Sequence, residues 1–453
     1  IEAAGKALEG LHFRIQISPM DCTGCGNCAD ICPAKEKALV MKAIAAQEEE
    51  IENWKFAISK IGYKTNIKIG ESFKDSQFKE PFMEFSGACA GCGEPPYIKL
   101  ITQLFGDRMM IANATGCSSI WGASAPSICY SINREGKGPA WASSLFEDNA
   151  EFGFGMHLAV KQMRKSLEEN MKTLLQSPID ENIRGLIREW IAGKEDGNIS
   201  KETGDKLLGL LDGYENPDGG IMRLVKLIQQ KKDYLTKRSQ WIIGGDGWAY
   251  DIGFGGLDQV MASGEDINVL VFDTEVYSNT GGQASKATPA AAVAKFAFSG
   301  KKSGKKDLGL MMMTYGNIYV AQVGIHADNT QLIKAVTEAE KYRGPSIIIA
   351  YAPCISHGMK KGMGKSMETI KQAVMAGYWH LYRYNPELKK EGKNPFILDS
   401  KEPAESFRDF LMEQVRYSSL IKTYPNEAEE LFSQAEEAAQ KRYEMYKRLA
   451  STM

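Results

Sequence analysis

Short apolar runs alternate with amphipathic segments through the middle of the chain. Runs of this length without polar alternation are typical of parallel strands that are buried on both faces of a sheet. Five of them predict strands: Met109–Ala112, Trp241–Ile243, Ile267–Phe272, Leu308–Thr314 and Ser346–Tyr351. A helix is expected over residues 329–342, with Asp328 as its N-cap and Gly344-Pro345 as its stop. The alternation predicts a doubly wound α/β domain.

Changes in this pattern divide the chain into three parts. The α/β pattern spans residues 76–365, and charged helical sequence interrupts it at about 157–238, which predicts a helical insertion. Residues 366–453 predict a helical C-terminal segment that contains a long amphipathic helix over 427–449. Residues 1–75 form a separate N-terminal part with a linker.

The N-terminal part contains Cys22-x-x-Cys25-x-x-Cys28-x-x-x-Cys32-Pro33. This spacing is that of [4Fe–4S] clusters in two-cluster ferredoxins, where three cysteines hold one cluster and the fourth reaches the other. Such a crossover needs a second run, and the sequence contains none. The first residue is Ile1 rather than Met. We therefore expect the chain to begin inside a ferredoxin-like domain and to be the C-terminal piece of a larger iron–sulfur protein. The alternative is a degenerate domain that holds one cluster.

Two other uses of these cysteines fit less well. A disulfide framework is typical of small, cysteine-dense secreted domains, whereas this chain has nine cysteines in 453 residues. Structural zinc usually takes two separated pairs of ligands rather than four thiols in one short run.

Two loops predict a site for a metal-bound diphosphate. The strand at 241–243 runs into Gly244-Gly245-Asp246-Gly247-Trp248, and the strand at 267–272 is followed by residues 273–282, which end in Gly281-Gly282. Glycines let backbone N–H groups approach phosphate oxygens, and a carboxylate holds a hard divalent cation. Both loops follow strand ends, where open α/β sheets bind ligands. The pair is a signature of thiamine diphosphate binding.

A second set of cysteines falls at the same edge of the predicted sheet. Cys89 and Cys92 form a CxxC motif, Cys117 follows the strand at 109–112, and Cys354 ends the strand at 346–351. Together they would make a four-cysteine site beside the diphosphate. A redox dithiol is an alternative for the CxxC motif, and a buried apolar role is the alternative for each single cysteine. That second role is our interpretation of Cys129.

Composition excludes several classes of function. The net charge is −2, from 55 basic and 57 acidic residues, so neither nucleic acid nor an anionic membrane is an expected partner. No apolar stretch approaches the roughly 20 residues that span a bilayer. Charged residues within positions 1–20 exclude the apolar core of a signal peptide. We expect a cytoplasmic protein.

Three stretches resemble the pyruvate:ferredoxin (flavodoxin) oxidoreductase family. They are Cys89-x-x-Cys92-Gly93-Glu94, residues 141–155, and residues 245–282. The resemblance covers essentially the whole chain and corresponds to the C-terminal part of that family: half of a ferredoxin domain, then the diphosphate-binding domain. The first ferredoxin cysteine run, the domain with the ring-activating Glu, the pyruvate-binding Arg and the coenzyme A domain have no counterpart here.

The resemblance implies the roles of individual residues. A proximal [4Fe–4S] cluster would be ligated by Cys89, Cys92, Cys117 and Cys354. Cys22, Cys25 and Cys28 would hold one ferredoxin-type cluster, and Cys32 would reach its partner. Magnesium would be bound by the Asp246 carboxylate, the Thr274 hydroxyl and the Val276 carbonyl. The diphosphate would lie against Gly245, Asp246, Gly247, Trp248, Thr274, Glu275, Val276, Tyr277, Ser278 and Asn279. Further cofactor contacts would come from Glu94, Thr115 and Cys117. Asn279 is the expected catalytic residue, since an amide beside the thiazolium can donate a hydrogen bond to a developing oxyanion.

The implied reaction is oxidative decarboxylation of pyruvate, with transfer of the acyl unit to coenzyme A and of electrons to ferredoxin or flavodoxin. The implied partners also include the remaining, N-terminal part of the polypeptide and a second copy in a homodimer. Two alternatives stay open from the residues. One is a related oxidoreductase of a different 2-oxoacid. The other is a non-catalytic electron-transfer module, against which the intact Asp246, Thr274 and Asn279 argue.

Overall fold

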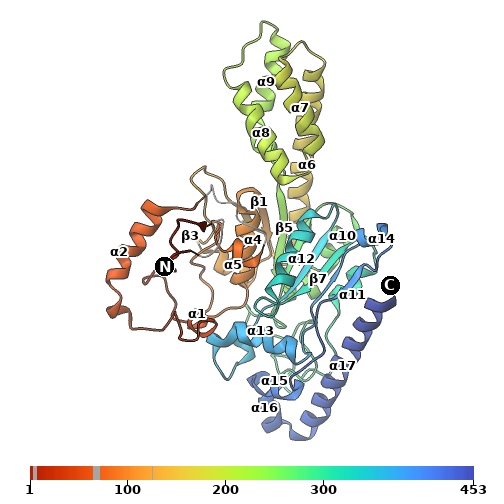
Figure 1. Cartoon of the computed structure of the whole chain (residues 1–453). Helices are drawn as coiled ribbons and strands as arrows, with labels where there is room; N and C mark the ends of the chain where they lie inside the picture. The colour runs from red at the N-terminus through yellow and green to blue at the C-terminus, as the bar shows by residue number, and fades with distance from the viewer. Residues whose placement is uncertain (4–7, 65–71, 125, 453) are drawn as a thin grey trace.

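The computed structural model describes residues 1–3, 8–64, 72–124 and 126–452. Its centre is a sheet of eight strands in the order β10-β9-β7-β8-β6-β5-β1-β4 (Figure 1). The strands from β7 to β4 are all parallel, and β9 and β10 add antiparallel pairs at one edge. The bounds of the sheet strands are β1 Met109–Asn113, β4 Ala140–Ser143, β5 Ser239–Gly245, β6 Asn268–Asp273, β7 Tyr319–Val323, β8 Ser346–Tyr351, β9 Tyr382–Tyr384 and β10 Phe396–Leu398. A separate pair is formed by β2 Ala123–Ser124 and β3 Ser127–Ile128.

The α-helices surround this sheet and extend beyond it. Those before β5 are α1 Asn27–Asp30, α2 Glu49–Phe56, α3 Phe73–Ser76, α4 Pro95–Phe105, α5 Cys117–Gly122, α6 Asn149–Leu175, α7 Glu181–Gly193, α8 Gly197–Leu211 and α9 Gly219–Gln230. Those after β5 are α10 Phe254–Ala262, α11 Leu308–Met313, α12 Asn329–Lys341, α13 Ser366–Met375, α14 Glu387–Lys390, α15 Phe407–Met412, α16 Val415–Thr423 and α17 Pro425–Thr452. Within the described part of the chain, none of these helices combines the length and apolar character that a membrane span requires.

Four of the five predicted strands are confirmed as β1, β5, β6 and β8. The prediction of a strand over Leu308–Thr314 is wrong, because these residues form the helix α11. The run contains only Leu, Gly and Met up to residue 313, which are not the β-branched residues that favour strands. The side chain of Asp307 accepts a hydrogen bond from the Leu310 amide and caps the helix. The predicted runs missed two parallel strands of the sheet, β7 Tyr319–Val323 and β4 Ala140–Ser143.

The C-terminal segment is mostly helical, as predicted, but it also contributes β9 and β10 to the sheet edge. Short strands of three residues each carry too weak an alternation to be recognised in a charged sequence. The long helix predicted over 427–449 is confirmed as α17, Pro425–Thr452. The predicted helix at 329–342 is confirmed as α12, and the Asp328 side chain caps it by accepting a hydrogen bond from the Gln331 amide.

The predicted helical insertion is formed by the outer part of α6 together with α7, α8 and α9, which project away from the sheet (Figure 1). It has an apolar core of its own, separate from that of the sheet. Its buried side chains are Leu167, Met171, Leu174, Ile183, Ile187, Trp190, Leu207, Leu211, Ile221, Val225, Ile228 and Leu235.

The N-terminal part of α6 lies directly on the sheet, and one glycine permits this approach. A Cβ atom on Gly153 would lie 2.4 Å from Ile242 Cγ1 of β5 and 3.0 Å from Ala112 Cβ of β1. Gly155 is on the same helix and has no neighbour within 4 Å of such a Cβ atom.

Because Gly153 has no room for a side chain, we expect Gly153→Ala to destabilise the protein by about 1–3 kcal/mol, as overpacking does elsewhere. The matched control Gly155→Ala should be neutral or stabilising by up to about 1 kcal/mol, since alanine is the better helix former and the space is open. Urea denaturation followed by tryptophan fluorescence measures both. Equal effects of the two substitutions would contradict the close contact.

Candidate functional site

Four of the predicted ligand loops start at the same edge of the sheet. Because β1, β5, β6 and β8 are parallel neighbours, their carboxyl ends lie together. Cys117 follows β1, Asp246 follows β5, Thr274 follows β6 and Cys354 follows β8. The sheet therefore brings the two predicted sites side by side.

The three oxygens predicted to bind magnesium are neighbours. The Thr274 hydroxyl lies 2.8 Å from Asp246 Oδ1 and 3.1 Å from the Val276 carbonyl oxygen. Adjacent oxygens of an octahedron with metal–oxygen distances of 2.0–2.1 Å would lie about 2.9 Å apart. This donor set has the hard oxygen chemistry and the spacing that Mg²⁺ takes, so the residues fit the cation.

The charge balance around Asp246 also fits a bound cation. Its carboxylate is fully buried, and burial together with the neighbouring Asp273 raises its pKa well above the usual value. Thr274 donates to Asp246 Oδ1 through its amide, and Ser285 donates to Oδ2 at 2.6 Å. These neutral donors orient the carboxylate without neutralising it. A divalent cation would supply the positive charge that the site lacks.

The glycine-rich turn after β5 is shaped by close packing. A Cβ atom on Gly247 would lie 2.6 Å from the ring of Tyr277, so only glycine allows the two loops to approach. A Cβ atom on Gly245 would meet its nearest neighbour, the Phe272 carbonyl oxygen, at 3.9 Å. Trp248 is fully buried beneath the turn. The half-buried Tyr277 ring also contacts the ring of Phe146 edge-on.

The cysteines of the second set influence one another. Burial raises the pKa of Cys92, and the charges of Glu94, Cys354 and Cys117 raise it further. Burial, Glu94, Cys354 and Cys89 raise the pKa of Cys117 to about 12. Such thiols do not ionise readily without a positive centre among them, which is what iron would supply. All nine cysteines are free thiols, and Cys129 is buried as predicted for a structural residue.

The cysteine set touches the diphosphate loop. The Cys117 sulfur lies 3.3 Å from the Ser278 hydroxyl, which in turn lies 3.5 Å from that of Thr274. Burial raises the pKa of Cys354, and the charges of Glu94 and Asp246 raise it further. Among the described residues, no three His, Cys, Asp or Glu side chains converge on a single ion. A four-iron cluster is larger than an ion, and its thiolates stand around it rather than meeting at one point.

The three remaining predicted contacts differ in their surroundings. Glu94 is buried and accepts a hydrogen bond from Trp121 Nε1 at 2.6 Å, and burial raises its pKa to about 7. Thr115 is exposed, and its hydroxyl donates to the Ser144 carbonyl at 2.6 Å. Asn279 is exposed at the end of the loop, so its amide is open to a ligand.

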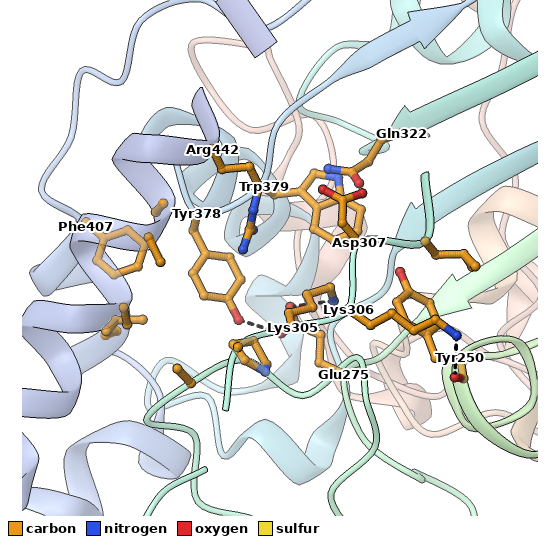
Figure 2. A pocket seen from close by; sticks show the side chains of 18 of the residues that line it. Tyr250, Glu275, Lys305, Lys306, Asp307, Gln322, Tyr378, Trp379, Phe407 and Arg442 are labelled. Carbon is orange, nitrogen blue, oxygen red and sulfur yellow. Dashed lines mark hydrogen bonds and ion pairs between the residues drawn. The ribbon is translucent and has the colours of Figure 1, made fainter. Parts of the chain in front are cut away.

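Glu275 differs from Thr274 and Ser278 of the same loop, because its side chain does not face Asp246 or Cys117. It projects into a cavity of about 60 Å³ beneath α15, α16 and α17 (Figure 2). Lys305 lies 3.2 Å from one carboxylate oxygen, and Arg416 and the Tyr378 hydroxyl lie 2.7 and 2.6 Å from the other. Burial alone would raise the pKa of Glu275, but Lys305 and Arg416 outweigh burial and lower it. Only the backbone of Glu275 is left for the predicted contact with a diphosphate.

Sequence reasoning did not identify several residues that shape the site. Ser285 orients Asp246, and Asn149 donates to the Ile243 carbonyl at 3.0 Å and fixes the start of α6 against β5. His357 is buried, and its Nε2 lies 2.7 Å from the Thr274 carbonyl oxygen. Burial, with Arg416 nearby, lowers its pKa to about 3, so it is neutral and donates this hydrogen bond. Ser285 lies three residues after Gly282, and His357 lies three residues after Cys354, so their closeness to predicted motifs was an available signal. Arg416 lies far along the chain and carries no local signal.

The ferredoxin-type cysteine run lies apart from the sheet. Cys22 and Cys28 are exposed, whereas Cys25 and Cys32 are half-buried. The helix α1 begins between Cys25 and Cys28, after Gly26, whose positive φ of 83° turns the chain.

Comparisons with known proteins agree with both motifs. Residues 225–350 match the family model of the thiamine pyrophosphate enzyme C-terminal TPP binding domain, and residues 15–35 match that of the 4Fe-4S binding domain. The first match spans β5, β6, β7 and all but the last residue of β8, and the second spans the Cys22–Cys32 run.

Curated relatives match over nearly the whole chain. It is 59% identical to the pyruvate:ferredoxin oxidoreductase of Moorella thermoacetica, over 99% of this chain and 38% of the relative. It is 56% identical to the pyruvate-flavodoxin oxidoreductase of Klebsiella pneumoniae, over 97% of this chain and 37% of the relative. Against the NADP⁺-dependent pyruvate dehydrogenase of Euglena gracilis the identity is 48%, over 97% of this chain and 24% of the relative.

The chain thus spans less than two fifths of the length of these relatives. The similarity nevertheless extends across the thiamine diphosphate loops, the cysteine motifs and the C-terminal helices alike. The resemblance first seen in the motifs is thereby confirmed, since the chain is similar over nearly its whole length to pyruvate:ferredoxin and pyruvate-flavodoxin oxidoreductases.

Proposed function

We propose that this chain forms the diphosphate-binding and cluster-binding part of an enzyme that oxidatively decarboxylates pyruvate to acetyl-CoA and CO₂. The electrons pass to ferredoxin or flavodoxin. Pyruvate and the two acceptors are suggested by the names of the relatives, and coenzyme A by the resemblance of the motifs. Binding of thiamine diphosphate and of [4Fe–4S] clusters is supported by the two family models.

Two contacts made by one loop carry the proposal. The loop over residues 274–278 presents the Thr274 hydroxyl to Asp246 and the Ser278 hydroxyl to Cys117, at 2.8 and 3.3 Å. A single short loop therefore adjoins both the proposed magnesium site and the proposed cluster site. An enzyme that only decarboxylates has no need of thiols at this position, whereas an enzyme that removes electrons from its substrate does.

The residues divide the work of this site between them. When bound, thiamine diphosphate supplies the carbon nucleophile and the electron sink that decarboxylation of a 2-oxoacid needs. Asp246, Thr274 and Val276 would hold Mg²⁺ and through it the diphosphate. Cys89, Cys92, Cys117 and Cys354 would hold the proximal cluster. The exposed amide of Asn279 would orient the substrate and donate a hydrogen bond where negative charge develops.

We expect Asp246→Ala to abolish retention of thiamine diphosphate and to leave the iron content unchanged. The substitution removes the only carboxylate of the proposed magnesium site, so the diphosphate charge is no longer neutralised, whereas no cysteine is touched. Cofactor fluorescence after desalting and iron analysis on anaerobically reconstituted protein measure the two quantities. The isosteric Asp246→Asn should give the same result, because it removes charge and keeps volume.

Asp258→Asn is a matched control for this experiment. Asp258 lies on the next helix, α10, and its carboxylate accepts a hydrogen bond from the Tyr315 hydroxyl at 2.8 Å. The same loss of charge at this position should leave both thiamine diphosphate and iron in place. Normal retention of thiamine diphosphate by the Asp246 variants would refute the assignment of that carboxylate.

We expect Cys354→Ala, introduced into the full-length polypeptide, to lose the proximal cluster and to lower pyruvate-dependent reduction of ferredoxin by orders of magnitude. Three thiolates would remain for a cluster that takes four. The ferredoxin-type signals should persist in electron paramagnetic resonance spectra, since their cysteines are elsewhere. Cys129→Ala is the control, because it removes a buried cysteine outside the proposed ligand set. It should cost about 1 kcal/mol of stability and no iron. An unchanged iron content in Cys354→Ala would exclude this residue as a ligand.

A further inference from the structure

One segment of the chain contacts both sets of cysteines. It runs from Cys354, at the end of β8, to Ser366, the first residue of α13, and is called the bridging segment here. It contains two short helical turns, Ile355–His357 and Met363–Lys365. Neither the motifs nor the family resemblance assigned a role to residues 355–366.

The first half of the bridging segment is fixed to the body of the protein. The imidazole of His357 donates to the Thr274 carbonyl, which ties the segment to the diphosphate loop. The Gly358 carbonyl accepts from the Val415 amide at 2.8 Å, and the Lys360 amide donates to the Glu413 carbonyl at 2.9 Å. The His357 side chain on one side and backbone hydrogen bonds to residues 413–415 on the other make this half a rigid support.

The middle of the segment lies against the CxxC loop. A Cβ atom on Gly91, which stands between Cys89 and Cys92, would lie 2.2 Å from the Met363 carbonyl oxygen. Just before the segment, Pro353 packs on Gly93, and its carbonyl accepts from the Gly93 amide at 3.2 Å. The CxxC loop is therefore in backbone contact with the chain on either side of Cys354.

The end of the segment lies against the ferredoxin-type run. A Cβ atom on Gly364 would lie 2.4 Å from the Cys25 carbonyl oxygen. Lys365 forms an ion pair with Asp30, and the side-chain amide of Asn27 donates to the Ser366 hydroxyl at 3.3 Å. Thus Met363 and Gly364, which are adjacent in sequence, contact the two different cysteine loops.

We propose that Gly364, Lys365 and Ser366 are positioning residues that dock the Cys22–Cys32 run onto the Cys89–Cys92 loop and fix the separation of the two clusters. The inference rests on the proposed function, because that function places a cluster on each loop. Gly364 permits backbone-to-backbone approach, and Lys365 with Ser366 sets the orientation of α1. The carbonyl of Cys25 cannot approach if residue 364 carries a side chain.

The ion pair of Lys365 with Asp30 and the backbone contact at Gly364 contribute differently to the docking. The Lys365 and Asp30 side chains are 36% and 28% exposed, and ion pairs this exposed change an equilibrium by only about two- to five-fold. The contact at Gly364 is steric and has no such solvent screening. We therefore expect Gly364 to determine how close the loops come and the ion pair to select one orientation of α1.

Hydrogen exchange across residues 18–32 tests the docking on the anaerobically reconstituted full-length polypeptide, which supplies the remaining cluster ligands. Gly364→Ala should accelerate exchange there by about ten-fold or more, since the loop must move away. Lys365→Glu and Asp30→Lys should each accelerate it about two- to five-fold. The double variant, Lys365→Glu with Asp30→Lys, should restore protection by reversing the ion pair. Spin–spin coupling between the reduced clusters should weaken in the single variants and recover in the double variant.

Lys361→Ala is the matched control, because Lys361 lies in the same segment but pairs with Glu413, with 3.5 Å between Nζ and Oε2. It should change neither exchange nor coupling. Wild-type protection of residues 18–32 in Gly364→Ala and in both single charge variants would overturn the docking inference. Thiamine diphosphate and iron contents of the wild type test the proposed function separately. Their absence there would contradict that function, while the exchange ratios would still report on docking.

Discussion

An imbalance of buried charge governs the centre of this protein. Three carboxylates, Asp246, Asp273 and Glu275, are buried behind the sheet edge, and within the described residues two cations, Lys305 and Arg416, lie against them. His357 is neutral and does not change the sum. Lys305 pairs with Asp273 and Glu275, and Arg416 pairs with Glu275, so the remaining negative charge falls on Asp246. Burying an uncompensated charge is costly. A cation at Asp246 would complete the balance, and it would do so at the place where a diphosphate needs one.

The loop after β6 separates the buried charges, because its successive side chains point in opposite directions. Thr274 and Ser278 face Asp246 and Cys117, whereas Asp273 and Glu275 face Lys305, Arg416 and the cavity beneath the C-terminal helices. Glu275 has a φ of 61°, which is unfavourable for a residue with a side chain. Its three polar partners compensate for this strain. The C-terminal segment is therefore more than a solvated appendage, since Tyr378 and Arg416 hold the loop in the conformation that presents Thr274.

Part of the fold and the placement of several candidate site residues at one sheet edge could be predicted from the sequence, for physical reasons that differ between residues. Asp246, Thr274, Cys117 and Cys354 could be brought together because parallel strands place their carboxyl ends at one edge, and the order of strand and motif is local information. The assignment of Leu308–Thr314 failed because apolar content alone does not distinguish a buried short helix from a strand; the Asp307 cap was the available signal. The orientation of Glu275 could not be predicted, since its partner Arg416 is distant in sequence. The strands β9 and β10 are too short to show a period.

The bridging segment follows from the same geometry. The loop after β8 must leave the sheet edge next to the loop after β6, because the two strands are neighbours. A segment that starts there is within reach of the diphosphate loop at one end, and His357 uses that proximity to fix it to Thr274. The Cys22–Cys32 run, which the other end of the segment contacts, is then held in a defined position relative to the diphosphate site. Glycines at 91 and 364 allow backbone contact on both sides, so the spacing depends on main-chain atoms rather than on flexible side chains. A rigid path of this kind is the arrangement expected where two redox centres must keep a fixed separation from each other and from a third site.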